Sequence, residues 1–143
     1  MYLDSSVLVK LFVREADSSF YAERANAHPQ AWSSQLTLTE CWSAFCRKNR
    51  EGEIDAETMR QAWSRLEAVV QEHSLQLQPV SVAVLRLANR MIEQCQRQTA
   101  IRTLDAIHLA SCELRGAYPL MTADNVMRKA ASVLGMPLIP LPK

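Results

Sequence analysis

Short apolar segments alternate with longer amphipathic segments along the whole chain. We interpret five short apolar segments as strands, at residues 1–4, 31–34, 75–80, 119–122 and 137–140. Between them, apolar residues recur every three to four positions, which is the spacing of one face of a helix. These patterns predict helices at residues 5–13, 17–27, 36–49, 55–73, 81–96, 103–115 and 125–134. The helix at residues 103–115 is apolar on most sides, so we expect it to be central and buried.

Strands that alternate with helices, without hairpin turn signals, are typical of a parallel sheet covered by helices on both faces. We therefore expect an α/β fold, a three-layer α/β/α domain with a short parallel sheet of about five strands. A chain of 143 residues is long enough for one domain with a hydrophobic core. We expect residues 1–143 to form that single domain.

Composition and charge narrow the function classes only slightly. The net charge of +1 means that any binding of nucleic acid must come from a local basic patch. The four cysteines lack the C-x₂₋₄-C spacing of a zinc site, so we interpret them as reduced thiols and expect a cytoplasmic location. Asp4 interrupts the apolar run that a signal peptide would need, and no apolar run approaches the roughly 18 residues of a membrane span.

Four of the fifteen acidic residues lie in apolar rather than polar sequence. Asp4 and Asp124 follow expected strands, whereas Glu40 and Asp105 lie in the first turns of expected helices. Because strand ends and the following helix starts share one edge of a parallel sheet, we expect the four carboxylates to converge on one crevice. Crowded carboxylates repel each other, and a divalent cation that prefers oxygen ligands, Mg²⁺ or Mn²⁺, would remove that repulsion.

Each of these acids also has a purely structural interpretation. Asp4 and Asp124 can cap the helices that follow them. Asp105 can be stabilised by the helix dipole, by roughly 0.3–1 kcal/mol, and Glu40 can simply be exposed on its helix. Taken singly, the acids are explained as well by helix starts as by chemistry. Their joint placement at one sheet edge is what favours a metal site.

Four short segments form a set of motifs. They are residues 2–10 (YLDSSVLVK), 39–40 (TE), 104–110 (LDAIHLA) and 122–124 (TAD). In this order, and in a chain of this length, they resemble the four motifs of PIN-domain ribonucleases, above all the VapC toxins of bacterial toxin–antitoxin pairs. The resemblance implies a metal-dependent endoribonuclease whose four acids hold one or two Mg²⁺ or Mn²⁺ ions. It also implies a homodimer that is neutralised by a VapB-type antitoxin.

The chemistry of RNA hydrolysis suggests a role for each acid. The reaction needs a nucleophilic water and a stabilised leaving oxygen, and bound metal ions can supply both. We expect Asp4 and Asp105 to be direct metal ligands. Asp124 and Glu40 would bind the metal through water, complete a second metal site or orient the attacking water.

Other residues near the acids could orient the carboxylates or bind RNA. Ser6 and Thr122 are candidates for fixing carboxylate orientation. Arg102 and Arg128 are the preferred candidates for contacts with RNA phosphates. His108, one turn after the third acid, could be a general base or a packing residue of the motif.

Two other functions fit part of the pattern. A phosphatase with an aspartyl nucleophile at Asp4 typically needs a second Asp two residues later, where this chain has Ser6. A non-catalytic PIN-like module that binds RNA or protein would be favoured by the loss of an acid, and none of the four is lost. A metal site does not read the 2′-hydroxyl, so its chemistry also allows DNA as substrate.

Overall fold

A short parallel sheet forms the middle layer of the molecule. The structure, a computed structural model, describes residues 1–142. The strands are β1 (Tyr2–Leu3), β2 (Ala31–Ser34), β3 (Leu75–Gln78) and β4 (Leu120–Met121). They form one sheet in the order β3-β2-β1-β4, and every pair of neighbours is parallel.

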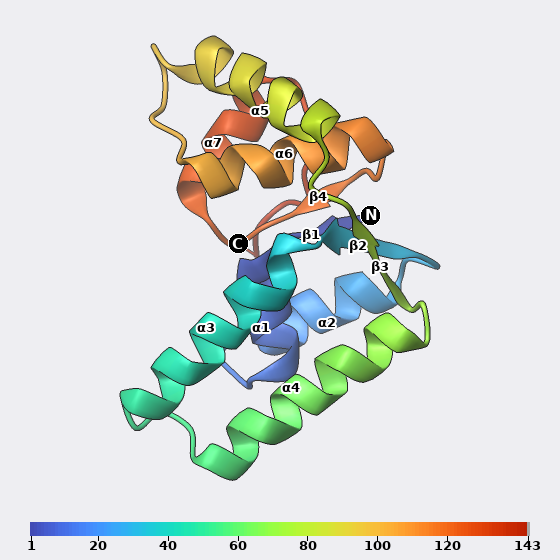
Figure 1. The fold of residues 1–143 in the computed structure, drawn as a ribbon, viewed down its shortest axis with the longest axis vertical. Helices are drawn as coiled ribbons and strands as arrows, with labels where there is room; N and C mark the ends of the chain where they lie inside the picture. The colour runs from blue at the N-terminus through green and yellow to red at the C-terminus, as the bar shows by residue number, and fades with distance from the viewer. Residues whose placement is uncertain (143) are drawn as a thin grey trace.

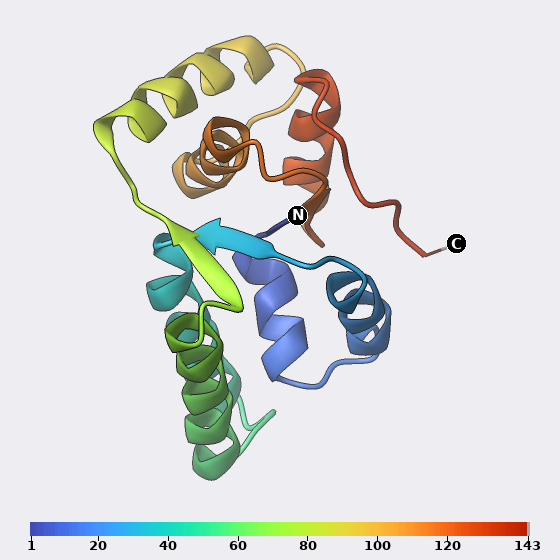
Figure 2. The same ribbon diagram turned by 90° about the vertical axis from the view of Figure 1, so that its right-hand side faces the viewer.

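Helices cover both faces of this sheet, as Figures 1 and 2 show. One face is covered by α1 (Ser5–Phe12), α2 (Ser18–Asn26), α3 (Leu36–Arg50) and α4 (Ala56–Gln71). The other face is covered by α5 (Val82–Cys95), α6 (Thr103–Arg115) and α7 (Asn125–Val133). This arrangement confirms the α/β/α architecture expected from the sequence.

The sheet separates two hydrophobic clusters. Consecutive side chains of a strand point to opposite faces, so Tyr2 packs among α5–α7 while Leu3 packs among α1–α4. Helix α6 is the centre of the first cluster, and Leu109 on this helix has no exposed surface. Full burial of such a side chain contributes about 1.5–3 kcal/mol. The expectation that this helix is central and buried is confirmed.

Side-chain caps define where several helices begin. Asp4, Asp55, Ser81 and Asp124 each accept a hydrogen bond from the backbone N–H three residues later, at the starts of α1, α4, α5 and α7. At the other end of α6, Gly116 takes the left-handed conformation, with φ of 64°, that ends the helix. Asp4 and Asp124, two of the candidate acids, therefore cap helices that begin at the same sheet edge, since β1 and β4 are paired.

The C-terminal segment needs one correction. The strand expected at residues 137–140 is reduced to a single parallel bridge between Leu120 and Leu138, so the sheet of the described residues has four strands. Pro137 and Pro140 flank this bridge, and proline has no N–H to donate to a neighbouring strand. Because residues 137 and 139 are the ones that face β4, Pro137 lacks the N–H that would extend the ladder toward its N-terminal side.

The cysteines and the helices bear on two further expectations. The four cysteines are free thiols, and three of them are buried: Cys41, Cys95 and Cys112. Among residues 1–142, no helix combines the length and the apolar character needed to cross a membrane.

Candidate active site

The four acidic side chains singled out in the sequence line one cleft of about 530 Å³. β1 and β4 are adjacent strands, and Asp4 and Asp124 follow them at the same sheet edge. Asp105 enters from the first turn of α6, and Glu40 enters from the second turn of α3. The structure thus brings together all four residues that the topology was expected to gather.

Asp4 is the most buried of the four acids, with 2% of its surface exposed. Its Oδ1 accepts hydrogen bonds from Ser6 Oγ at 2.7 Å and from the Val7 backbone N–H at 3.1 Å, and its Oδ2 accepts one from Thr122 Oγ1 at 2.6 Å. Burial raises the pKa of Asp4, and nearby His108 and these hydrogen bonds offset only part of this effect. A cation in the cleft would stabilise the charged form of this carboxyl group.

Ser6 and Thr122 each connect Asp4 to the loop between β4 and α7. The backbone N–H of Ala123 donates to Ser6 Oγ at 3.0 Å, and that of Asp124 donates to Thr122 Oγ1 at 3.0 Å. Both hydroxyls selected from the sequence as orienting groups therefore contact the Asp4 carboxylate. Through Thr122, the position of Asp4 is also linked to that of Asp124.

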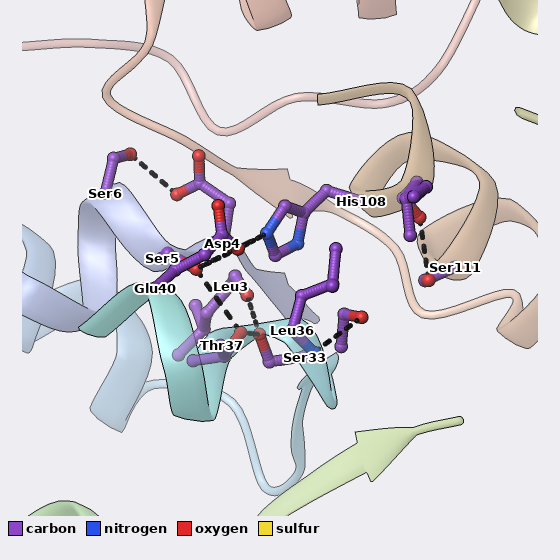
Figure 3. A network of polar contacts seen from close by, with 12 residues as sticks. Leu3, Asp4, Ser5, Ser6, Ser33, Leu36, Thr37, Glu40, His108 and Ser111 are labelled. Atoms are coloured by element: carbon purple, nitrogen blue, oxygen red, sulfur yellow. Dashed lines mark hydrogen bonds and ion pairs between the residues drawn. The ribbon is translucent and has the colours of Figure 1, made fainter. Parts of the chain in front are cut away.

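Glu40 is held by two side chains from other elements (Figure 3). Ser5 Oγ donates to Glu40 Oε1 at 2.8 Å, and His108 Nε2 lies 2.6 Å from the same oxygen. Burial alone would raise the pKa of Glu40, but the contacts with His108 and Ser5 outweigh burial and lower it. Glu40 is therefore ionised at neutral pH.

Asp105 and Asp124 keep the helix-start contacts that the sequence allowed as an alternative. Asp105 Oδ2 accepts a hydrogen bond from the backbone N–H of Arg102 at 3.3 Å, and Asp124 Oδ1 accepts one from that of Met127 at 2.8 Å. In the part of the chain that the structure describes, the second oxygen of each carboxylate has no hydrogen-bond partner. The structural and the functional interpretation are therefore compatible, because each acid uses one oxygen for the helix.

The donors in the cleft suit a hard divalent cation, although they do not form a compact ligand cluster. Within residues 1–142, no group of three or more Asp, Glu, His or Cys side chains is arranged to hold a metal ion. Mg²⁺ usually keeps several water ligands and binds through one or two carboxylates, so it needs no such cluster. The residues fit a Mg²⁺ or Mn²⁺ ion by their oxygen chemistry and by their shared cleft.

Three basic side chains also line the cleft, and they are Arg47, Lys48 and Arg102. Arg47 follows Glu40 by seven positions, or two helical turns, and this spacing is the sequence signal that places it on the same face of α3. Arg128, expected from the sequence to contact RNA, donates to the backbone carbonyls of Thr122 at 3.2 Å and Ile139 at 3.0 Å. Its guanidinium thus holds the C-terminal segment against the end of β4.

Tyr2 is a residue near the site that the sequence did not indicate. Its hydroxyl lies 2.8 Å from Nδ1 of His108, and the two rings meet edge to face with centroids 5.9 Å apart. A tyrosine in a short apolar strand fits the pattern of a core residue, so its polar contact could not be foreseen. The contact places a buried hydroxyl directly behind the Glu40–His108 pair.

Comparison with known proteins relates this site to an established family. Residues 1–133 match the family described as PIN domain. The chain is also 36% identical to ribonuclease VapC46 of Mycobacterium tuberculosis over 141 residues, which cover 97% of this chain and 95% of that protein. These matches extend across all four motifs.

Two solved structures share the fold. A chain of a toxin–antitoxin complex from Klebsiella pneumoniae superposes with a TM-score of 0.65 and 16% identity, covering 97% of this chain and 95% of that one. Mycobacterium tuberculosis VapC20, described as a sarcin-ricin loop cleaving toxin, has a TM-score of 0.66 and 17% identity over 90% of this chain and 93% of its own. At these identities the likeness concerns the fold alone. The family match over residues 1–133 and the relationship to ribonuclease VapC46 show that this chain belongs to the PIN-domain family.

Proposed function

We propose that this chain is a metal-dependent endoribonuclease, which hydrolyses RNA phosphodiester bonds with an activated water. One observation carries the proposal, namely the convergence on one cleft of Asp4, Glu40, Asp105 and Asp124. Identity of 36% to a ribonuclease, over nearly the whole chain, supports RNA as the substrate. The non-catalytic alternative gains no support, because all four acids are present and share the cleft.

The proposed cofactor is Mg²⁺ or Mn²⁺. Asp4 and Asp105 would be the direct ligands, while Asp124 and Glu40 would bind through water, complete a second site or orient the attacking water. A bound divalent cation supplies a nucleophilic water at neutral pH and stabilises the leaving 3′-oxygen.

The residues of the chain hold the acids and the substrate. Ser6 and Thr122 fix the Asp4 carboxylate, because each donates to a different one of its oxygens. Arg47 and Arg102 line the cleft and would bind RNA phosphates, which positions the strand without reading its sequence. Arg128 stays a weaker candidate for this role, since two backbone carbonyls already accept its hydrogen bonds.

We also propose that the chain is the toxin of a type II, VapBC-like pair. Its relationship to VapC46 and its likeness to a chain of a toxin–antitoxin complex support this role. The partner would be a VapB-type antitoxin that places a basic side chain in the acidic cleft, and the toxin would be a homodimer. A cytoplasmic location fits the four free thiols, which persist in a reducing compartment.

Cleavage of RNA by the purified full chain tests the proposed chemistry. Mg²⁺ or Mn²⁺ added to metal-free protein should start cleavage, and EDTA should stop it. Asp105→Asn keeps an oxygen to accept from the Arg102 N–H, yet it should lower cleavage at least about 100-fold because it removes a ligand charge. Asp55→Asn is the matched control, since Asp55 caps α4 outside the cleft and Asn caps a helix as well as Asp. Equal cleavage in EDTA would contradict the proposal.

Expression of the chain alone in a bacterial host tests the toxin role. The wild-type chain should arrest growth, and Asp105→Asn should not. Co-expression of a small protein encoded immediately upstream should restore growth if that protein is the antitoxin. Unaffected growth would contradict the toxin role and leave the nuclease activity to be judged in vitro, where a DNA strand of the same sequence tests the substrate class.

A further inference from the structure

We propose that Tyr2 and His108 are positioning residues that hold the Glu40 carboxylate at the cleft. The inference rests on the proposed function, in which Glu40 handles a metal ion or its water. Tyr2 Oη lies 2.8 Å from His108 Nδ1, and His108 Nε2 lies 2.6 Å from Glu40 Oε1. This chain of contacts joins β1, α6 and α3, and Figure 3 shows the ring of His108 directed at Glu40.

The direction of each hydrogen bond follows from the groups at the two ends. An ionised carboxylate can only accept, so Nε2 of His108 carries a proton and donates it to Glu40. We take the ring as a neutral imidazole, in which the other nitrogen accepts, so the Tyr2 hydroxyl would donate to Nδ1. Tyr2 can act as this donor, because a neutral phenol carries one O–H, and its oxygen lies 2.8 Å from Nδ1. The tyrosine therefore fixes which nitrogen faces Glu40 with its proton.

Burial excludes solvent from both positioning side chains. Tyr2 has no exposed surface and His108 has 2%. A buried polar group without a partner destabilises the fold, and here each polar atom of the two rings has one. Because both nitrogens of His108 are occupied, neither is free to take a proton from water. The geometry thus favours positioning over the general-base role that the sequence left open.

Both donors hold the same oxygen of Glu40. Ser5 Oγ contacts Oε1 at 2.8 Å, and His108 contacts that atom as well. Among the residues that the structure describes, Oε2 has no hydrogen-bond partner. One oxygen is therefore fixed by the protein, while the other is available to a water or a metal ion in the cleft.

A double variant tests whether this contact matters for the reaction. Tyr2→Phe combined with His108→Leu removes both polar groups together, so no buried hydroxyl is left without a partner. With Mn²⁺, kcat for RNA cleavage should fall about 10- to 100-fold, the range for partners of metal ligands, while KM for RNA changes little. His108→Gln in place of His108→Leu, in the same Tyr2→Phe background, should restore part of kcat, because the glutamine amide N–H can reach toward Glu40. Tyr21→Phe is the matched control, since Tyr21 is buried in the other cluster.

The same double variant in a Glu40→Gln background shows whether the effect passes through Glu40. There it should cause almost no further loss of kcat, because the residue that it positions has already lost its charge. An equal loss in both backgrounds would overturn the proposal, and so would full kcat in the double variant. Thermal unfolding of each variant verifies that the compared proteins are folded.

Nitrogen NMR of the His108 ring in the metal-free chain provides a readout that needs no cleavage. We expect Nε2 to be protonated and Nδ1 to be a bare acceptor. Tyr2→Phe should shift the Nδ1 resonance, and Glu40→Gln should shift that of Nε2. A ring protonated at Nδ1 would overturn the positioning proposal. A wild-type chain inactive on RNA would instead overturn the proposed function. The NMR result would still show whether Tyr2 and His108 hold Glu40 in the proposed way.

Discussion

Two groups of acidic side chains in this molecule are stabilised in opposite ways. The cleft acids are Asp4, Glu40, Asp105 and Asp124. The lysine-paired acids are Glu15, Asp17 and Glu53. The two groups meet at the cleft, because Glu15 also lines it.

The lysine-paired acids have their charges balanced within the protein. Lys10 Nζ lies 2.6 Å from Glu15 and 2.9 Å from Asp17. Lys48 Nζ lies 3.2 Å from Glu15 and 2.8 Å from Glu53. Burial alone would raise the pKa of Glu15, but its hydrogen bonds with the two lysines outweigh burial and lower it. These ion pairs join the turn after α1 to the C-terminal end of α3.

The cleft acids keep a surplus of negative charge. Within residues 1–142, the one Arg or Lys within ion-pair distance of them is Arg102, whose Nε lies 3.5 Å from Asp105. Asp4 is held by hydroxyl and backbone donors instead, and burial raises its pKa. The contrast fits the proposed roles, in which the paired acids stabilise the fold and the cleft acids would bind an external cation.

Asp4→Asn should have the largest effect and tests the contrast directly. Loss of a buried ligand charge should lower RNA cleavage about 10²- to 10⁴-fold, since several kcal/mol of stabilisation depend on the metal. Mn²⁺ should raise the melting temperature of the wild type but not of Asp4→Asn. The metal-free stability should change little, because the variant removes a charge that is costly to bury.

Asp17→Asn is the matched control from the lysine-paired group. It makes the same chemical change at a residue that Lys10 neutralises, so the Mn²⁺ response and cleavage should survive. A Mn²⁺ response that persists in Asp4→Asn, or disappears equally in both variants, would remove the difference between the two groups.

The cleft acids could be predicted because short-range patterns place them. Asp4 and Asp124 follow apolar strands, and Glu40 and Asp105 lie within the first two turns of helices, so the topology alone brings them to one edge. Helix and strand order also follow from hydrophobic periodicity, which is a local property. Fold class and candidate acids were therefore accessible from the sequence.

The supporting contacts were not accessible because they join distant positions. The hydroxyl of Tyr2 finds His108 across 106 positions of sequence, and no local pattern encodes this pair. The ion pair between Lys48 and Glu15 depends likewise on how α3 packs beside α1. The prediction of a last strand at residues 137–140 was wrong for a different reason, because Pro137 has no N–H with which to continue the pairing beside Leu138.

Lys48→Met should have the next largest effect, on stability. The variant keeps the aliphatic stem but leaves Glu15 and Glu53 without their shared lysine, whose side chain is 11% exposed. We expect the free energy of unfolding in urea to fall by about 1–2 kcal/mol, between the values for exposed and buried pairs. Lys129→Met, at an exposed lysine of α7, is the control and should change it by less than about 0.5 kcal/mol. Equal losses would show that the ion pairs add nothing to the fold.

Substitution of the cleft arginines should have a smaller effect, on RNA affinity. Arg47→Gln and Arg102→Gln should each flatten the dependence of log affinity on log salt by about 0.7, the value for one lost contact with single-stranded RNA. Binding is measured in the Asp4→Asn background, so that the RNA is not cut. Arg128→Gln should lower stability and leave the salt dependence unchanged, because its donors bind backbone carbonyls. If Arg128→Gln also flattened the dependence of log affinity on log salt, Arg128 would contact RNA phosphates after all.

The pH dependence of stability should show the smallest effect, and its sign separates the two groups. The folded pKa of Glu15 lies below its ordinary value of 4.5, so its stabilisation is present above about pH 4.5 and is lost as the pH falls further. Glu15→Gln should therefore make the acid loss of stability shallower. The folded pKa of Asp4 is raised, so its protonation in acid favours folding, and Asp4→Asn should make that loss steeper.

Urea unfolding of the metal-free variants between about pH 3 and pH 7 measures both slopes. The change for Glu15→Gln should be modest, because its ion pairs are partly exposed and are screened by salt. Added salt should therefore reduce the Glu15 effect more than the Asp4 effect, since Asp4 is shielded from solvent. If both variants changed the slope in the same direction, lysine pairing would not distinguish the two groups of acids, and the surplus charge of the cleft would need another explanation.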